Sequence, residues 1–176
     1  MGLENVKVHL VRSFEDARQC NEWFQQAIGP LGTMAIDTET TGLKWQTDDY
    51  VRTVQIGDAE HGWMIPKDYW WGLFLDIAHQ HEGPVDMMNA PFDYSMLKKA
   101  GVEIPKHRIQ DVGVMSHVLE PHMNRGLKWQ ADRHVDPSAS AGQRFLDEAM
   151  EQNKWTWATV PWDFPWYWRY GALDPV

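Results

Sequence analysis

Residues 33–57 read TMAIDTETTGLKWQTDDYVRTVQIG, and this stretch decides the fold that we expect. Its apolar start, Thr33–Asp37, and the alternating segment Val51–Gly57 are typical of two strands. The short aromatic segment Gly62–Ile65 follows as a third strand, and Thr41 with Gly42 ends the first. The pattern therefore predicts a three-stranded meander within one sheet.

The flanking sequence adds strands before the meander and helices after it. Ser13 is a suitable N-cap for a helix that reaches Ile28, and Pro91 suits the first turn of another helix. The expected strands are Val6–Val11 and Val85–Met88, and the expected helices are Ser13–Ile28, Tyr69–His81, Pro91–Ala100, Asp111–Leu119, Leu127–Val135, Ala139–Asn153 and a last one from Phe164. This order predicts an α/β fold, a mixed β-sheet flanked by α-helices, with a helix-rich C-terminal half.

Composition sets the class of protein. A chain of 176 residues with 43% apolar residues fits one domain, 1–176, and its apolar runs are too short to cross a bilayer, so we expect no membrane. The single cysteine and an N-terminal segment without an apolar signal core favour a cytoplasmic location. The net charge of −9 argues against binding long nucleic acids by phosphate neutralisation. It is compatible with binding of a single phosphate through a metal ion.

Four carboxylates stand in three short motifs. Asp37 and Glu39 are two residues apart on the first strand of the meander, so both project from one face. Taken alone, the pair is equally compatible with a solvated strand end. Asp93 falls in the first turn opened by Pro91, where the helix dipole stabilises any aspartate, and Asn89 stands four residues earlier at the strand end.

The third motif is Tyr170-Gly-Ala-Leu-Asp174, whose tyrosine and aspartate lie on one face of the last helix. A single Tyr-x-x-x-Asp pattern carries little information. Together, however, Asp37, Glu39, Asp93 and Asp174 can converge on oxygen-preferring cations such as Mg²⁺ or Mn²⁺.

The chain resembles the DEDD superfamily of 3′→5′ exonucleases, which is DnaQ-like and ribonuclease H-like, in the branch with tyrosine in its third motif. The resemblance rests on Asp37-Thr-Glu39 with Leu43, on Asn89-x-x-x-Asp93 and on Tyr170-x-x-x-Asp174, and it covers nearly the whole chain. It is greatest with the proofreading domain of family A DNA polymerases of phage or bacterial type, and ribonuclease D-type enzymes are close behind.

The resemblance implies a mechanism and a substrate. Two divalent cations, Mg²⁺ or Mn²⁺, would be held by Asp37, Glu39, Asp93 and Asp174, and Tyr170 would orient the attacking water. By the same analogy, Thr40, Leu43 and Asn89 would contact the terminal nucleotides at the 3′ end of single-stranded or frayed DNA. Because the chain ends two residues after Asp174, we expect a domain truncated from a longer protein with a C-terminal polymerase region.

Several alternatives remain open at this point. A ribonuclease D-like RNA exonuclease has the same motifs, and a catalytically silent module for docking or DNA positioning belongs to a different class. The segment 155–168 holds five of the eleven tryptophans, which can pack under the last helix or stack on bases. The histidines lack the companion cysteines of a zinc site, and the basic residues 98–99 and 106–108 are typical of a solvated surface.

Overall fold

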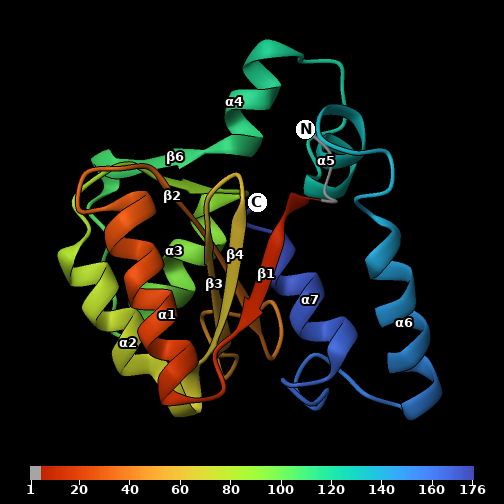
Figure 1. Ribbon diagram of the computed structural model, residues 1–176. Coiled ribbons are helices and arrows are strands. Elements are labelled where there is room, and N and C mark those ends of the chain that lie inside the picture. Colours follow the sequence, from red (N-terminus) through yellow and green to blue (C-terminus); the bar gives the residue numbers. More distant parts are fainter. Residues whose placement is uncertain (1–4) are drawn as a thin grey trace.

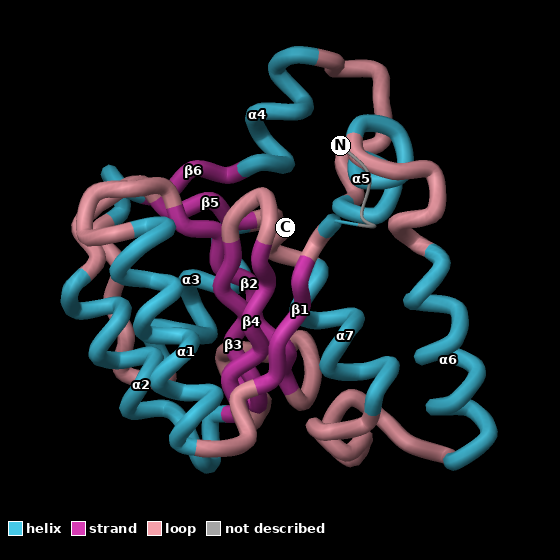
Figure 2. The backbone as a smooth tube through the Cα atoms, viewed as in Figure 1, coloured by secondary structure: helices cyan, strands magenta, loops and turns pink. Residues whose placement is uncertain are grey.

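A computed structural model describes residues 5–176; the first four residues of the predicted domain and of its N-terminal segment lie outside the described part. The centre of the fold is a six-stranded mixed sheet with the order β1-β4-β3-β2-β5-β6 (Figures 1 and 2). Its strands are β1 Lys7–Leu10, β2 Met34–Thr40, β3 Val51–Gly57, β4 His61–Pro66, β5 Val85–Met87 and β6 Ile109–Asp111. The meander β2-β3-β4 is antiparallel as predicted, and the other three pairings are parallel.

Seven α-helices accompany the sheet within residues 5–176. They are α1 Phe14–Trp23, α2 Lys67–Gln80, α3 Ala90–Lys99, α4 Val112–Leu119, α5 Leu127–His134, α6 Ala141–Asn153 and α7 Pro165–Leu173. A π-helical turn, Phe24–Ile28, extends α1 to the predicted end, and Lys106–Arg108 form a 3₁₀ turn. None of these helices has the length and apolar composition that a membrane span requires.

The two faces of the sheet carry separate hydrophobic cores. Helices α1, α2 and α3 cover one face, and α7 covers the other with α6 outside it (Figure 1). Ile36, Val54 and Ile56 point into the first core, as predicted for Ile36. Leu10 and Met64 point into the second core, against α7. Because side chains alternate along a strand, Asp37 and Glu39 face the α7 side.

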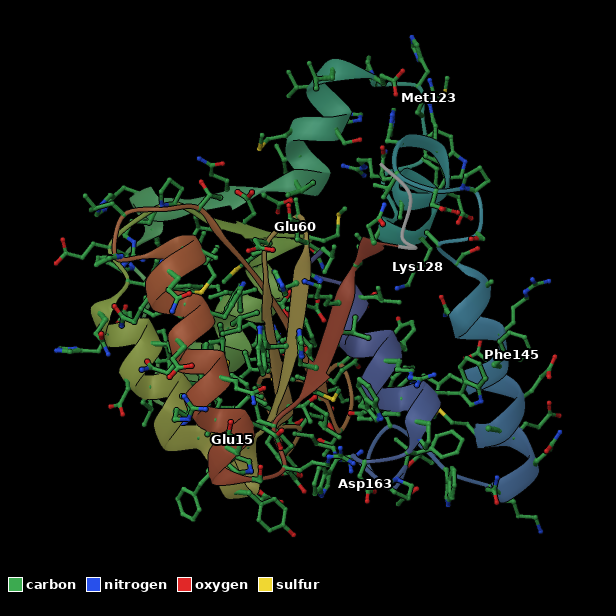
Figure 3. All side chains as sticks on the ribbon, in the orientation of Figure 1. Glu15, Glu60, Met123, Lys128, Phe145 and Asp163 are labelled. Carbon is green, nitrogen blue, oxygen red and sulfur yellow. The ribbon has the colours of Figure 1, made fainter. Side chains whose placement is uncertain are left out.

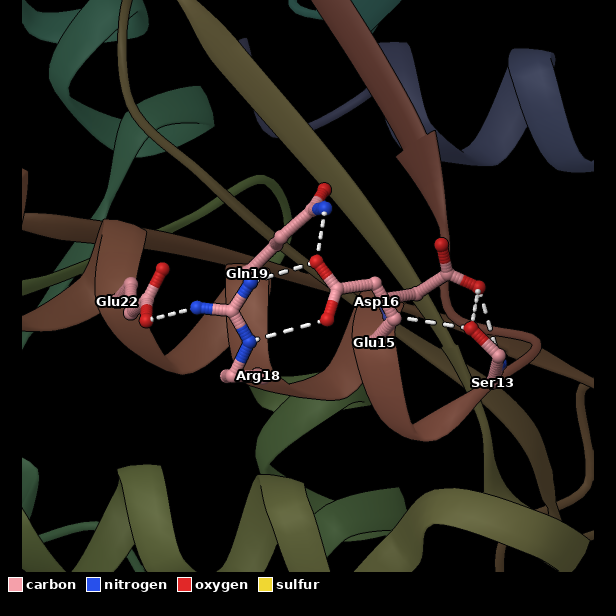
Figure 4. Close-up of polar contacts among 6 residues, drawn as sticks. All are labelled: Ser13, Glu15, Asp16, Arg18, Gln19 and Glu22. Atoms are coloured by element: carbon pink, nitrogen blue, oxygen red, sulfur yellow. Dashed lines mark hydrogen bonds and ion pairs between the residues drawn. The ribbon is translucent and has the colours of Figure 1, made fainter.

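The start of α1 shows how local sequence fixes an element, as Figure 4 illustrates. The Ser13 hydroxyl accepts a hydrogen bond from the Asp16 amide at 3.2 Å, and the Asp16 carboxylate accepts one from the Ser13 amide at 2.9 Å. This reciprocal capping box satisfies amide groups that the helix itself leaves unpaired. Arg18 adds ion pairs to Glu15 and Glu22, one turn away on either side.

One strand was not predicted. The expected helix began at Asp111 and no strand was expected before it, but Ile109–Asp111 pair with β5 as a parallel edge strand, and α4 begins at Val112. Three residues are too few to display an alternating pattern, so the pairing is decided by tertiary contact. Asp111 fixes the junction: its carboxylate accepts hydrogen bonds from the amides of Ala90 at 3.0 Å and Val114 at 3.1 Å.

The pairing of β2 with β3 changes register beside the candidate site. Glu39 is opposite Thr53 and Thr40 is opposite Val51, so Arg52 is the extra residue of a β-bulge. The Arg52 guanidinium donates to the backbone oxygens of Trp157 at 2.5 Å and Val160 at 2.7 Å. The bulge therefore ties the segment before α7 to the centre of the sheet.

Candidate metal centre

Close packing of α7 on the sheet brings the third motif to the first. A Cβ atom at Gly62 would lie 1.7 Å from the Ala172 oxygen, and one at Gly171 would lie 2.8 Å from the Met64 methyl carbon. Glycine is therefore required at Gly62, where the opposing atom is backbone, whereas at Gly171 a larger residue would have to displace the end of the Met64 side chain. Asp174 follows the last residue of α7 and keeps helical backbone angles.

Three carboxylates meet between β2 and the end of α7. Asp37, Glu39 and Asp174 each place one oxygen so that the three atoms lie within 4.8 Å of one another. Like charges at this separation repel unless positive charge lies between them. Such a set of oxygen donors fits a hard divalent cation, for which Mg²⁺ and Mn²⁺ are the usual choices.

Asp93 does not belong to this three-oxygen group, although the sequence predicted four converging carboxylates. It is buried in the first turn of α3, and its Oδ1 accepts a 2.5 Å hydrogen bond from the Thr38 hydroxyl, which points to the opposite face of β2 from Asp37. Asp93 is still close enough to raise the pKa of Asp37 by charge repulsion. The structure thus places it beside the cluster, with its side chain turned to Thr38.

Burial and mutual repulsion perturb every acidic group here. Burial raises the pKa values of Asp37 and Glu39 well above their usual range, and their acidic neighbours raise them further. Burial also raises the pKa of Asp93 to about 7, although the hydrogen bond from Thr38 opposes the shift. For Asp174, burial raises the pKa and Lys128 opposes the increase. This concentration of costly negative charge is typical of sites that bind cations or act chemically.

Lys128 is the site residue that sequence reasoning missed. It lies at the N-terminal end of α5 (labelled in Figure 3), and its ammonium group makes an ion pair with the Asp174 carboxylate. The same nitrogen lies 4.1 Å from the centre of the Tyr170 ring. Forty-six residues separate Lys128 from Asp174, and a lone lysine in a helical stretch gives no sequence signal of such a contact.

Tyr170 joins the cluster from α7, as the four-residue spacing predicted. Its ring contacts the Lys128 ammonium on one side and lies 6.1 Å from the Trp157 ring, centroid to centroid. Burial raises the pKa of the Tyr170 hydroxyl above its usual value of about 10, and the nearby carboxylates add to the shift. The phenol therefore stays protonated near neutral pH and can donate a hydrogen bond.

A cavity of about 350 Å³ lies beside the acidic cluster. Asp37, Asp174 and Asp86 line it, together with Val112 and Leu127 at the starts of α4 and α5. Burial raises the pKa of Asp86, and its Oδ1 has no hydrogen-bond partner among the described residues. Asp86 is a further acidic group that the motifs did not indicate.

The residues expected to contact nucleotides lie in different environments. Thr40 is buried and its hydroxyl donates to the Gly42 oxygen at 2.7 Å, which makes it an anchor of the following loop. Leu43 is exposed in that loop. Asn89 is also exposed, at the N-cap of α3, with a left-handed backbone (φ 59°) that asparagine tolerates better than most residues. Their nucleotide contacts stay predictions.

The other singled-out groups have structural contacts. Tryptophans 155, 157, 162 and 168 pack against the core beneath α7, which favours the packing alternative. His81 is buried, with Nε2 2.7 Å from the Gly32 oxygen and Nδ1 2.7 Å from the Arg108 guanidinium. Lys98 pairs with Glu103. Arg108 is therefore an internal contact and not part of the solvated surface that we predicted.

Comparison with known proteins gives two relatives, both polymerases of phages. The DNA polymerase of Mycobacterium phage L5 is 25% identical over 190 aligned residues, 97% of this chain and 31% of that protein. The DNA polymerase DpoZ of Vibrio phage phiVC8 is 26% identical over 107 residues, 58% of this chain and 17% of that protein. The chain thus spans less than a third of these relatives, and no family model matches it.

Solved structures match nearly the whole chain. The Aedes aegypti Nibbler EXO domain has a TM-score of 0.65 at 16% identity, covering 96% of this chain and 82% of that one. Escherichia coli RNase D, an exoribonuclease, has a TM-score of 0.61 at 16% identity, covering 97% and 42%. Brucella melitensis NrnC with bound Mg²⁺ also has a TM-score of 0.61 at 16% identity, covering 97% and 75%.

The mixed sheet and its flanking helices therefore form a ribonuclease H-like fold. More narrowly, the chain has the DnaQ-like 3′–5′ exonuclease fold, and over most of its length it is distantly similar to phage DNA polymerases.

Proposed function

We propose that this chain is a metal-dependent 3′–5′ exonuclease that removes nucleotides from the 3′ end of single-stranded or frayed DNA. The observation that carries the proposal is the approach of Asp37, Glu39 and Asp174 within 4.8 Å, on a fold shared with exonucleases. The similarity to a phage DNA polymerase over 97% of the chain supports DNA as substrate. It also supports a polymerase region as the partner in the full-length protein, and a cytoplasmic location fits this role.

Each site residue has a role in the proposed reaction. Two Mg²⁺ or Mn²⁺ ions, when bound, would activate a water and stabilise the leaving 3′ oxygen. Asp37, Glu39 and Asp174 would hold them, and Asp93 would complete the set after turning from Thr38. The Tyr170 hydroxyl would orient the attacking water by a hydrogen bond, because its raised pKa keeps it protonated near neutral pH and so unavailable as a base.

The decisive experiment digests a 5′-labelled single-stranded DNA with Mg²⁺ or Mn²⁺, beside EDTA. We expect a ladder that shortens from the 3′ end, is absent in EDTA, and is lost in Asp37→Asn and Asp174→Asn. Asp163→Asn is the matched control, since Asp163 is an exposed aspartate before α7 (labelled in Figure 3) and is not one of the three clustered carboxylates. A ladder that persists in Asp37→Asn would overturn the site assignment.

RNA is the second candidate substrate, supported by the structural similarity to Escherichia coli RNase D. Matched DNA and RNA oligomers of one sequence without thymine or uracil separate the two candidates, because only the 2′-hydroxyl then differs. Faster cleavage of RNA would identify RNA as the substrate and would leave the assignment of the metal centre unchanged. A folded protein that binds Mn²⁺ in calorimetry and cleaves neither oligomer would instead be a silent module.

A further inference from the structure

The loop between β2 and β3, residues 41–50, exposes three large side chains. Leu43 is 80% exposed, Trp45 41% and Tyr50 52%. Isolated exposed apolar residues are ordinary on protein surfaces, but three within eight residues of one loop form a concentrated patch. The loop directly follows β2, the strand that carries Asp37 and Glu39 of the candidate metal centre.

The loop is rigidly held, which is unusual for a segment that only connects two strands. The Asp49 carboxylate accepts from the Thr41 hydroxyl at 3.1 Å and from the Lys44 amide at 2.8 Å. A Cβ atom at Gly42 would lie 2.6 Å from that carboxylate, so a larger residue there would displace the Asp49 side chain. Lys99 of α3 donates to the backbone oxygens of two loop residues, including Asp49 at 2.6 Å.

The base of the loop is closed next to the cluster. The Thr41 amide donates to the Tyr50 oxygen at 3.0 Å, and the Tyr50 amide donates to the Thr41 hydroxyl at 3.1 Å. Thr41 follows Glu39 by two residues, so the loop begins within two residues of a carboxylate of the cluster. A pre-formed loop loses little conformational entropy on binding, which favours a role in holding a ligand.

The aromatic side chains of the patch indicate which kind of ligand it binds. With a net charge of −9, the chain is poorly suited to gripping a nucleic acid strand through its phosphates. Aromatic rings instead hold bases by stacking, at about 1–3 kcal/mol per base and with little dependence on sequence. We propose that Trp45 and Tyr50 form a stacking platform for the bases of the single strand leading into the metal centre. This inference rests on the proposed function and adds the residues that hold the strand.

The test measures binding of the full chain to a fluorescent ten-nucleotide oligo-dT, with Ca²⁺ in place of Mg²⁺ to slow cleavage. A second oligomer of equal length and charge has abasic sites in place of the bases. We expect Trp45→Ala and Tyr50→Ala each to weaken binding of oligo-dT at least about fivefold, the equivalent of about 1 kcal/mol. Neither should change binding of the abasic oligomer, and Trp45→Phe should retain most of the affinity.

Phe14→Ala is the matched control, because Phe14 is an exposed aromatic residue at the start of α1. Equal losses on both oligomers, or no loss on oligo-dT, would overturn the platform. A change in oligomeric state on Trp45→Ala without a change in binding would also overturn it and make the loop a contact between copies of the chain. Failure of the proposed function would give a different result. The wild-type protein would then cleave no oligomer, while Trp45→Ala would still weaken binding of oligo-dT and not of the abasic oligomer.

Discussion

Lys128 is expected to act as the counter-ion of the acidic cluster when no metal is bound, and Lys128→Met tests this. The side chains of Lys128 and Asp174 are 25% and 6% exposed. Removing one member of a buried ion pair costs about 3–5 kcal/mol, and partial exposure of Lys128 reduces this to about 2–3 kcal/mol. For a chain of this length, about 2–4 °C per kcal/mol corresponds to a fall in Tm of about 4–12 °C in EDTA.

The expected result in metal is different. A divalent cation among Asp37, Glu39 and Asp174 supplies the positive charge that Lys128→Met removes, so the difference in Tm should shrink to about 2 °C or less in saturating Mn²⁺. The variant should also bind Mn²⁺ more tightly in calorimetry, because no ammonium group competes for Asp174. Thermal unfolding of both proteins, each with EDTA and with Mn²⁺, provides the comparison.

The control is Lys44→Met, a change of charge at an exposed lysine, which should alter stability by about 0.5 kcal/mol or less. Two outcomes would refute the reasoning. An equal loss of stability in EDTA and Mn²⁺ would mean that Lys128 contributes packing and not charge. Unchanged stability in EDTA would mean that the cluster does not need the lysine.

Three further changes have expected outcomes. The pKa of Asp93 is raised from 3.8 to about 7, so its contribution favours folding below 3.8 and is lost as pH rises through 7. In EDTA the Tm should therefore fall as pH rises from about 4 to 7 and change little above 7, and Asp93→Asn should reduce the slope; a rising Tm would contradict this. Arg52→Met removes two hydrogen bonds to the segment before α7 and should lower unfolding free energy by about 2–4 kcal/mol in urea titration, with unchanged stability as the opposing result. Ser13→Ala removes the capping box of α1 and should cost about 1 kcal/mol without changing cleavage, whereas lost cleavage would refute a purely local role.

The sequence predicted most of the fold because its signals are local. The meander has turn residues between alternating segments, α1 has a serine N-cap, and α3 has a proline in its first turn. Strand β6 was missed because its three residues have no periodicity of their own and depend on pairing with β5. The register change at Glu39 could not be predicted either, since it depends on how β2 and β3 pair.

For the candidate site, sequence indicated the three carboxylates that come together, but not that the fourth, Asp93, turns to Thr38. The two-residue spacing of Asp37 and Glu39 predicted a shared face, and the structure brings Asp174 to them. The hydrogen bond that holds Asp93 to Thr38 depends on the angle between α3 and β2, which no spacing encodes. Lys128 was missed for the same reason, because its contact joins α5 to the end of α7, 46 positions further along the chain.

The position of the cluster links metal binding to the docking of α7. Asp37 and Glu39 interrupt the sheet face on which α7 packs, so that face cannot be held by apolar contact alone. Asp174 sits at the end of α7, and its approach to two buried carboxylates is unfavourable until a cation joins them. Lys128 provides one such charge, and a divalent cation would provide more. Metal should therefore strengthen the attachment of α7 to the sheet. We expect the Gly171–Leu173 amides to exchange their hydrogens more slowly in Mn²⁺ than in EDTA. Equal exchange rates would mean that metal binding does not affect the docking of α7.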